Sequence, residues 1–179
     1  MKTRHPIVIL GLTPLIGVLP ATAAHGDTPV RARGAGELRD LQVTTEQPTD
    51  HATAQVVAIE SNGSTIVRLK VQGLAHFAAG TELGAHIHVG SCEKGNGAAA
   101  RRHYNSSTTN PLTVTSSTEV WLDFEIGSNG TASAEAHVPF VIPPGGAGAL
   151  VIHAAGTSTG PTPPAGSAGA RWACLPVEF

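Results

Sequence analysis

The chain has 179 residues, with 11 basic and 13 acidic residues and a formal net charge of −2. Nucleic-acid binding needs clustered Lys and Arg, and Arg101-Arg102 is a pair only, so the composition argues against a nucleic-acid partner. The chain also contains 21 glycines and 13 prolines, as expected for many short segments joined by turns.

The first 24 residues have the form of an export signal peptide. Lys2 and Arg4 give a basic start, residues 7–19 are mostly apolar, and Ala21-Thr22-Ala23 has the small-x-small form of a cleavage site. The apolar run is short and is interrupted by two prolines, so we expect no membrane span. Removal of this segment leaves about 155 residues, a single-domain size, and we expect the protein to be secreted, either periplasmic or extracellular.

Residues 25–50 are rich in Gly, Pro, Thr and charged side chains, and we expect them to form a flexible N-terminal arm. Within this arm, Arg31 to Leu41 has a weak helical pattern. The pattern changes at about residue 51, and residues 51–179 are predicted to form one folded domain.

Several short segments of this domain have the apolar or alternating pattern of β-strands. They are residues 55–59, 65–71, 119–126, 131–141, 149–152 and 172–175. Asn62-Gly63 and Asn129-Gly130 each separate two of these segments and are typical of two-residue hairpin turns. After residue 50 no segment keeps a helical apolar period, so we predict an all-β sandwich or barrel.

Two long segments lack a strand pattern, residues 90–118 and residues 154–170. Each follows, within a residue or two, a predicted strand that ends in histidine. The second segment consists of small residues and prolines and has no charged residue. Long ordered loops in a compact β domain often carry function, so we expect two functional loops.

Four histidines are candidate metal ligands. His86 and His88 are separated by one apolar residue in a predicted strand, so both side chains point to the same face of a sheet. His103 lies in the first long loop, and His153 ends the strand before the second. Neutral imidazoles bind several transition metals, and four of them without a thiolate or thioether suit copper.

Cys92 and Cys174 are the two cysteines of the chain. In an exported protein two cysteines favour one disulfide, although two unpaired thiols are the alternative. A bond between them would close a loop of about 80 residues and stabilise the fold by about 4 to 5 kcal/mol through chain entropy.

Four blocks of the chain resemble, in order, the copper-zinc superoxide dismutase family in its exported bacterial form. The blocks are residues 84–92, His103-Tyr104-Asn105, residues 148–153 and residues 166–174. The resemblance covers the chain from about residue 52 to the C-terminus. It implies a Greek-key, immunoglobulin-like β-sandwich that uses copper to convert superoxide to oxygen and hydrogen peroxide.

The resemblance also implies a role for each matched residue. His86, His88 and His153 correspond to ligands of copper alone, and His103 to the histidine that bridges copper and zinc and takes up a proton during the cycle. Cys92 and Cys174 match the family's disulfide. Arg171 matches the arginine that draws superoxide to copper, since a fixed guanidinium beside the metal attracts and orients a small anion.

The zinc site of the family is incomplete in this chain. The family uses two further histidines and an aspartate, but no histidine lies between His103 and His137, and His137 lies in a predicted strand. We therefore expect copper alone, with zinc absent or partial. The far nitrogen of His103 then needs another partner, either Asp123 or Glu119, and Asp123→Ala is predicted to lower activity while copper is retained.

Loss of the zinc ligands leaves an alternative function, a non-catalytic exported copper-binding or storage protein with the same fold. The charge-free second loop predicts a more open metal site than in the family. The superoxide anion is the expected partner. The sequence leaves a monomer and a homodimer equally open.

Overall fold

The computed structural model describes residues 30–179, so the predicted signal peptide lies outside the described part of the chain. It contains ten strands and two short 3₁₀ helices. These are β1 (Val30–Glu37), β2 (Arg39–Asp40), β3 (Thr53–Ser61), β4 (Ser64–Gln72), η1 (His76–Ala78), β5 (Glu82–Leu83), β6 (Ala85–His88), η2 (Gly97–Ala100), β7 (Phe124–Glu125), β8 (Thr131–Val138), β9 (Ala149–His153) and β10 (Arg171–Pro176). Among the described residues, no helix has the length and apolar character needed to cross a membrane.

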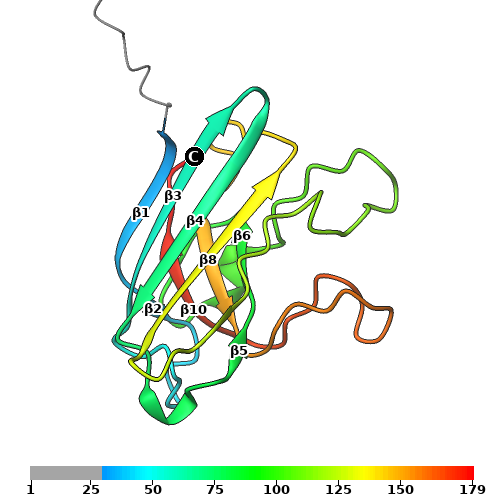
Figure 1. Cartoon of the computed structure of the whole chain (residues 1–179). Coiled ribbons are helices and arrows are strands. Elements are labelled where there is room, and N and C mark those ends of the chain that lie inside the picture. Colours follow the sequence, from blue (N-terminus) through cyan, green and yellow to red (C-terminus); the bar gives the residue numbers. More distant parts are fainter. Residues whose placement is uncertain (1–29) are drawn as a thin grey trace, which may run out of the picture.

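The strands form two four-stranded antiparallel sheets packed as a sandwich (Figure 1). The strand order is β1-β3-β4-β8 in the first sheet and β2-β10-β9-β6 in the second, while β5 and β7 form a small separate pair. The chain passes from one sheet to the other after β1, after β2, between β4 and β6, between β6 and β8, and between β8 and β9. The predicted all-β Greek-key sandwich is therefore confirmed.

The core lies between the two sheets because the strands alternate apolar and polar residues. On β4, Val67, Leu69 and Val71 are buried, whereas Arg68 and Lys70 between them are exposed. The second sheet adds, among others, Ile87, Leu150 and Ile152 to the same core. Since Ile87 points inward, its neighbours on β6 must point to the opposite face of their sheet.

One predicted hairpin is confirmed and the other is wrong. Asn62 and Gly63 have φ values of 51° and 77° and connect β3 to β4, which pair along their full lengths. At Asn129-Gly130 a turn does form, but β8 pairs with β4 and β7 pairs with β5. Only Phe124–Glu125 of the predicted strand 119–126 is strand, because Glu119 and Trp121 instead form isolated β-bridges with Asn105 and His86.

The predictions of a flexible arm and a weak helix are wrong for residues 30–41. Residues 30–37 form β1, which pairs with β3 from Val30–Ile59 to Glu37–Thr53, and Arg39–Asp40 pair with β10. The inward residues of β1 are small, and a Cβ at Gly34 would lie 2.4 Å from the carbonyl oxygen of Pro176. A strand buried through Ala and Gly has a weak apolar period, which explains the error.

Two long loops project from the same side of the sandwich (Figure 1). The first loop, residues 89–123, follows β6, and the second loop, residues 154–170, joins β9 to β10. A disulfide joins Cys92 in the first loop to Cys174 on β10, with a Cα–Cα distance of 5.6 Å and a sequence separation of 82. The predicted cysteine pairing is therefore present, and it ties the first loop to the second sheet.

Candidate metal centre

Four imidazoles meet on the outer face of the second sheet, beneath the two loops. His86 and His88 come from β6 and His153 from the end of β9, the strand beside it. His103 is brought alongside His88 by a β-bridge between the two residues. One nitrogen from each of the four rings lies within 4.8 Å of the corresponding nitrogens of the others. The structure thus brings together all four predicted ligands.

Backbone carbonyls determine which nitrogen of His88 and His153 is free. The Nδ1 of His88 lies 3.2 Å from the carbonyl oxygen of Arg101, and the Nδ1 of His153 lies 3.4 Å from that of Gly169. A carbonyl oxygen only accepts, so each Nδ1 carries the proton and each Nε2 has a free lone pair. The two Nε2 atoms are 3.4 Å apart, and a cation between them would relieve the repulsion of their lone pairs.

In His86 the nitrogen left free for a metal is Nδ1, whereas in His88 and His153 it is Nε2. Its side chain is fully buried, and its Nε2 lies 2.6 Å from the hydroxyl oxygen of Thr157. Its Nδ1 is also buried and has no hydrogen-bond partner within residues 30–179. A buried polar atom without a partner costs about 1 to 3 kcal/mol. A metal ion would satisfy this atom together with the free nitrogens of the other rings, so these residues fit a metal.

The environment keeps these rings neutral. Burial, followed by the neighbouring imidazoles, lowers the pKa of His86 far below its usual range and that of His88 to about 2. Burial also lowers the pKa of His153 to about 4, partly opposed by its hydrogen bond to Gly169. A metal ligand must be unprotonated, and these three rings meet that requirement at neutral pH without the metal.

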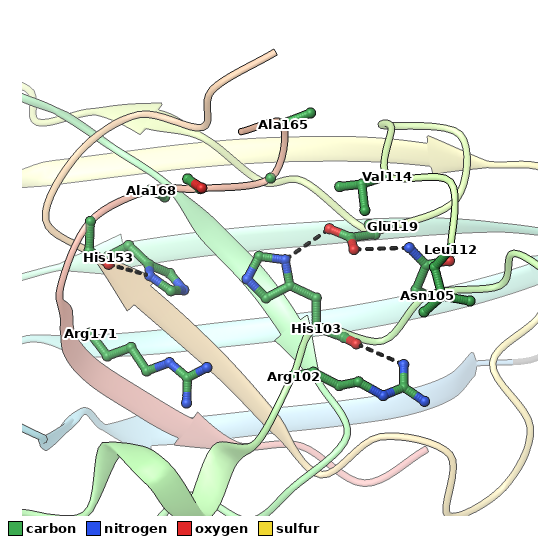
Figure 2. Close-up of a pocket in the computed structure, with 13 residues that line it drawn as sticks. Arg102, His103, Asn105, Leu112, Val114, Glu119, His153, Ala165, Ala168 and Arg171 are labelled. Carbon is green, nitrogen blue, oxygen red and sulfur yellow. Dashed lines mark hydrogen bonds and ion pairs between the residues drawn. The ribbon is translucent and has the colours of Figure 1, made fainter. Parts of the chain in front are cut away.

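Glu119 is the partner of the far nitrogen of His103. Its Oε2 lies 2.8 Å from the Nδ1 of His103, and its Oε1 accepts a hydrogen bond from Asn105 at 3.0 Å (Figure 2). The Oε2 also accepts a hydrogen bond from Trp121 Nε1 at 3.0 Å. Burial alone would raise the pKa of Glu119, but the hydrogen bonds from His103, Trp121 and Asn105 outweigh it and lower the pKa. The buried side chain is therefore a carboxylate, able to hold a proton on Nδ1 of His103.

Asp123, the other predicted candidate, contacts a different residue. Its Oδ1 accepts a hydrogen bond from the backbone N–H of Thr157 at 2.6 Å. Thr157 itself was not identified from the sequence, because it lies in a loop of small residues without any motif. His137 is exposed on β8, with its Nε2 2.6 Å from Glu135, which agrees with its exclusion from the ligand set.

Arg171 is held at the edge of the histidine cluster by the first loop. Its Nη1 donates to the carbonyl oxygen of Gly97 at 2.6 Å and its Nη2 donates to that of Arg101 at 2.5 Å. The Arg101 carbonyl also accepts the Nδ1 proton of His88, so one backbone oxygen connects the guanidinium to a metal-site ring. Arg101 has φ 59° and ψ −145°, a conformation that costs a non-glycine residue about 1 to 3 kcal/mol and is found at functional sites.

An open cleft of about 620 Å³ leads to the cluster. Arg171, His103 and His153 line it together with Glu119, and the Leu112 and Val114 side chains form part of its wall (Figure 2). Arg102 also lines the cleft and is exposed. Small anions therefore have a path from solvent to a fixed guanidinium beside the imidazoles.

The fold has known counterparts, although no family model and no curated protein matches the sequence. A structure of a double mutant of a SOD-like protein from Bacillus subtilis aligns with a TM-score of 0.55 and 19% identity, covering 82% of this chain and 95% of that one. The Cu/Zn superoxide dismutase from Brucella abortus aligns with a TM-score of 0.55 and 20% identity, covering 80% of this chain and 98% of that one. At these identities the likeness establishes a shared fold. The resemblance to the copper-zinc superoxide dismutase family is therefore confirmed at the level of the fold. The four-histidine cluster and the disulfide fit this resemblance.

Proposed function

We propose that the protein is a copper-dependent superoxide dismutase. The observation that carries this proposal is the convergence of four imidazoles, each with one nitrogen free for a metal, beside an arginine at the end of an open cleft. Packing alone does not require this combination, because without a metal the buried Nδ1 of His86 has no hydrogen-bond partner among the described residues.

Copper fits the donors better than other metals. All four donors are imidazole nitrogens. The sulfurs of Cys92 and Cys174 are joined in the disulfide, so neither is a thiolate. Among first-row divalent metals, copper also forms the strongest complexes with such ligands. When bound by His86, His88, His103 and His153, copper would supply a centre that accepts one electron and later returns it.

The reaction balances without another redox partner. Two superoxide anions and two protons yield one O₂ and one H₂O₂, so one superoxide loses an electron and the other gains it. The protein must therefore attract an anion twice per cycle and deliver protons to the second. These two tasks can be assigned to residues of this chain.

Arg171 is the residue we assign to anion binding. Its guanidinium is fixed by the carbonyls of Gly97 and Arg101, so little rotamer entropy remains to be lost when an anion binds. Positive charge in a cleft raises the local anion concentration and the association rate. Arg171 both attracts superoxide and orients it toward the cluster.

His103 is the residue we assign to proton transfer. Glu119 holds a proton on its Nδ1, which leaves Nε2 to face the cluster and to take up or release a proton. His103 lines the cleft, so a proton on Nε2 can reach a bound anion. In this proposal Glu119 fills the orienting role that zinc has in the family, and zinc is not required.

Export belongs to the same proposal. A disulfide between Cys92 and Cys174 persists in oxidising compartments, and the N-terminal 24 residues have a signal-peptide pattern. We propose that the mature protein acts in a periplasmic or extracellular compartment.

The test is superoxide consumption by the copper-loaded mature protein, measured by stopped flow, together with metal analysis. We expect one copper per chain, turnover, and loss of both in His88→Ala. Copper binding without turnover would instead support the storage function. Absence of copper binding would contradict both functions and leave only the shared fold. One zinc per chain after purification would contradict the copper-only proposal.

A further inference from the structure

Thr157 links the second loop to a buried metal-site histidine. Its hydroxyl oxygen lies 2.6 Å from Nε2 of His86, and its backbone N–H donates to Oδ1 of Asp123 at 2.6 Å. Asp123 lies one residue before β7, at the end of the first loop. The three residues thus form a chain of contacts from the first loop, through the second loop, to β6.

The backbone beside β6 is shaped for this contact. Gly84 immediately precedes β6, and a Cβ at this position would lie 3.0 Å from Oγ1 of Thr157 and 2.9 Å from the carbonyl oxygen of Ala155. The N–H of Gly84 donates to that same carbonyl at 2.8 Å. Absence of a side chain at residue 84 therefore lets the second loop approach closely enough for Thr157 to reach His86.

The hydroxyl of Thr157 differs from the partners of the other three rings. His88 and His153 face carbonyl oxygens and His103 faces a carboxylate, all of which only accept hydrogen bonds. A threonine hydroxyl can donate or accept, so it is compatible with either tautomer of His86. Its position, and hence its distance from Nε2, is fixed by the bond to Asp123.

The unpartnered Nδ1 of His86 decides between the two tautomers. With a proton on Nδ1, a buried N–H would have no acceptor within the described residues, and orphaned buried N–H groups are rare. With the proton on Nε2, the hydroxyl of Thr157 accepts it and Nδ1 presents a lone pair to the cluster. The second arrangement is the one in which His86 can bind a metal.

We propose that Thr157, held in place by Asp123, is a positioning residue that keeps His86 in the Nε2–H tautomer and so presents Nδ1 to copper. This inference rests on the proposed copper site, but not on superoxide turnover. It also changes the role of Asp123, which acts on His86 through Thr157 and not on His103. Consequently Asp123→Ala is expected to weaken copper binding, in contrast to the expectation from the sequence that copper is retained.

The test compares three variants of the mature protein. Thr157→Val removes the hydroxyl with little change in shape, and Thr157→Ser restores a hydroxyl. Thr159→Val is the control, because it makes the same Thr-to-Val substitution at an exposed position two residues further along the same loop. Copper(II) affinity is measured by competition with a chelator, and the copper(II) site by electron paramagnetic resonance. In the diamagnetic copper(I) form, nitrogen-15 NMR detects the Nε2–H of His86 and its exchange with solvent.

We expect Thr157→Val to weaken copper(II) binding by about 10- to 100-fold, as is typical for the loss of a hydrogen-bond partner of a metal ligand. Its paramagnetic spectrum should change, and the Nε2–H of His86 should exchange rapidly. Thr157→Ser and Thr159→Val should match the wild type in all three measurements. If Thr157→Val does not fold, as judged by circular dichroism, Thr157→Ala replaces it with the same expectations.

If the variant that lacks the hydroxyl has the same copper affinity, paramagnetic spectrum and Nε2–H exchange as the wild type, the inference is overturned, even if the enzyme is active. Conversely, a protein that binds copper in a Thr157-dependent manner but does not consume superoxide would support the inference and contradict the proposed function. Failure of the wild type to bind copper would overturn both.

Discussion

The two loops over the histidine cluster are built in different ways. The first loop is fixed by the Cys92–Cys174 disulfide and contains charged residues, including Glu119, and the carbonyls that hold Arg171. The second loop has no charged residue and supplies a hydroxyl at Thr157 and a backbone carbonyl at Gly169. The chemistry of the site is therefore concentrated in the first loop, while the second loop orients two of the rings.

The largest expected effect comes from releasing the first loop. Replacing both cysteines, Cys92→Ser with Cys174→Ser, should lower the free energy of unfolding by about 4 to 5 kcal/mol, because the bond closes a loop of about 80 residues in the unfolded chain. Urea denaturation of the metal-free protein measures this value, with the reduced wild type as the control. A loss below about 1 kcal/mol would mean that the first loop does not depend on the disulfide.

Glu119→Gln tests the chemical role of the first loop. The amide keeps the size of the side chain but loses its charge, so His103 is oriented less strongly. We expect superoxide turnover by the copper-loaded protein to fall by about 10- to 100-fold, and to fall further at high pH, where protons must be supplied by the protein. Glu93→Gln is the matched control, since Glu93 is an exposed glutamate of the same loop that contacts Ser91 and Asn96 and not His103. Equal turnover in Glu119→Gln and the wild type would remove Glu119 from the mechanism.

Arg171→Ala tests the guanidinium that the first loop holds in the cleft. Loss of the charge should lower kcat/KM for superoxide by about tenfold or more, because steering by a charged cleft raises association rates by at least that factor. The dependence of kcat/KM on ionic strength should also weaken. Arg171→Lys keeps the charge without the planar fork, so its kcat/KM is expected to lie between those of the wild type and Arg171→Ala. An unchanged salt dependence in Arg171→Ala would show that another group steers the anion.

Gly166→Ala tests the packing between the two loops. Gly166 has φ +83°, and a Cβ there would lie 2.7 Å from a methyl group of Val114 in the first loop. We expect a loss of about 1 to 3 kcal/mol in stability from the strained backbone, measured by thermal or urea denaturation. Gly160→Ala is the matched control in the same loop, where a Cβ would meet nothing within 4 Å. An equal effect of the two substitutions would show that the loops do not pack on each other at Gly166.

The contrast between the loops also explains what could be predicted from the sequence. His86 and His88 flank an inward Ile87, and this alternation alone predicted a shared face. The choice between Asp123 and Glu119 could not be made from spacing, because it depends on how the first loop folds back to pair Asn105 with Glu119. Thr157 could not be recognised at all, since one threonine in a loop of small residues carries no pattern.

Some elements of the fold could likewise be predicted from the sequence and others could not. The hairpin at Asn62-Gly63 was predictable because both strands alternate clearly and the turn residues are typical. The first strand was missed because its buried positions are filled by Ala32 and Gly34, which have little apolar surface. The incorrect hairpin at Asn129-Gly130 arose because a good turn pattern does not determine which strands pair on either side of it.

The most direct test of the proposed function is superoxide consumption by the copper-loaded wild type beside His88→Ala at equal protein concentration. His88 is fully buried and its Nε2 lies 3.4 Å from that of His153, so its loss removes one donor from the centre of the cluster. We predict turnover in the wild type with one copper and no zinc per chain, and neither bound copper nor turnover in the variant. A copper-loaded wild type that consumes superoxide no faster than the buffer would contradict the proposal.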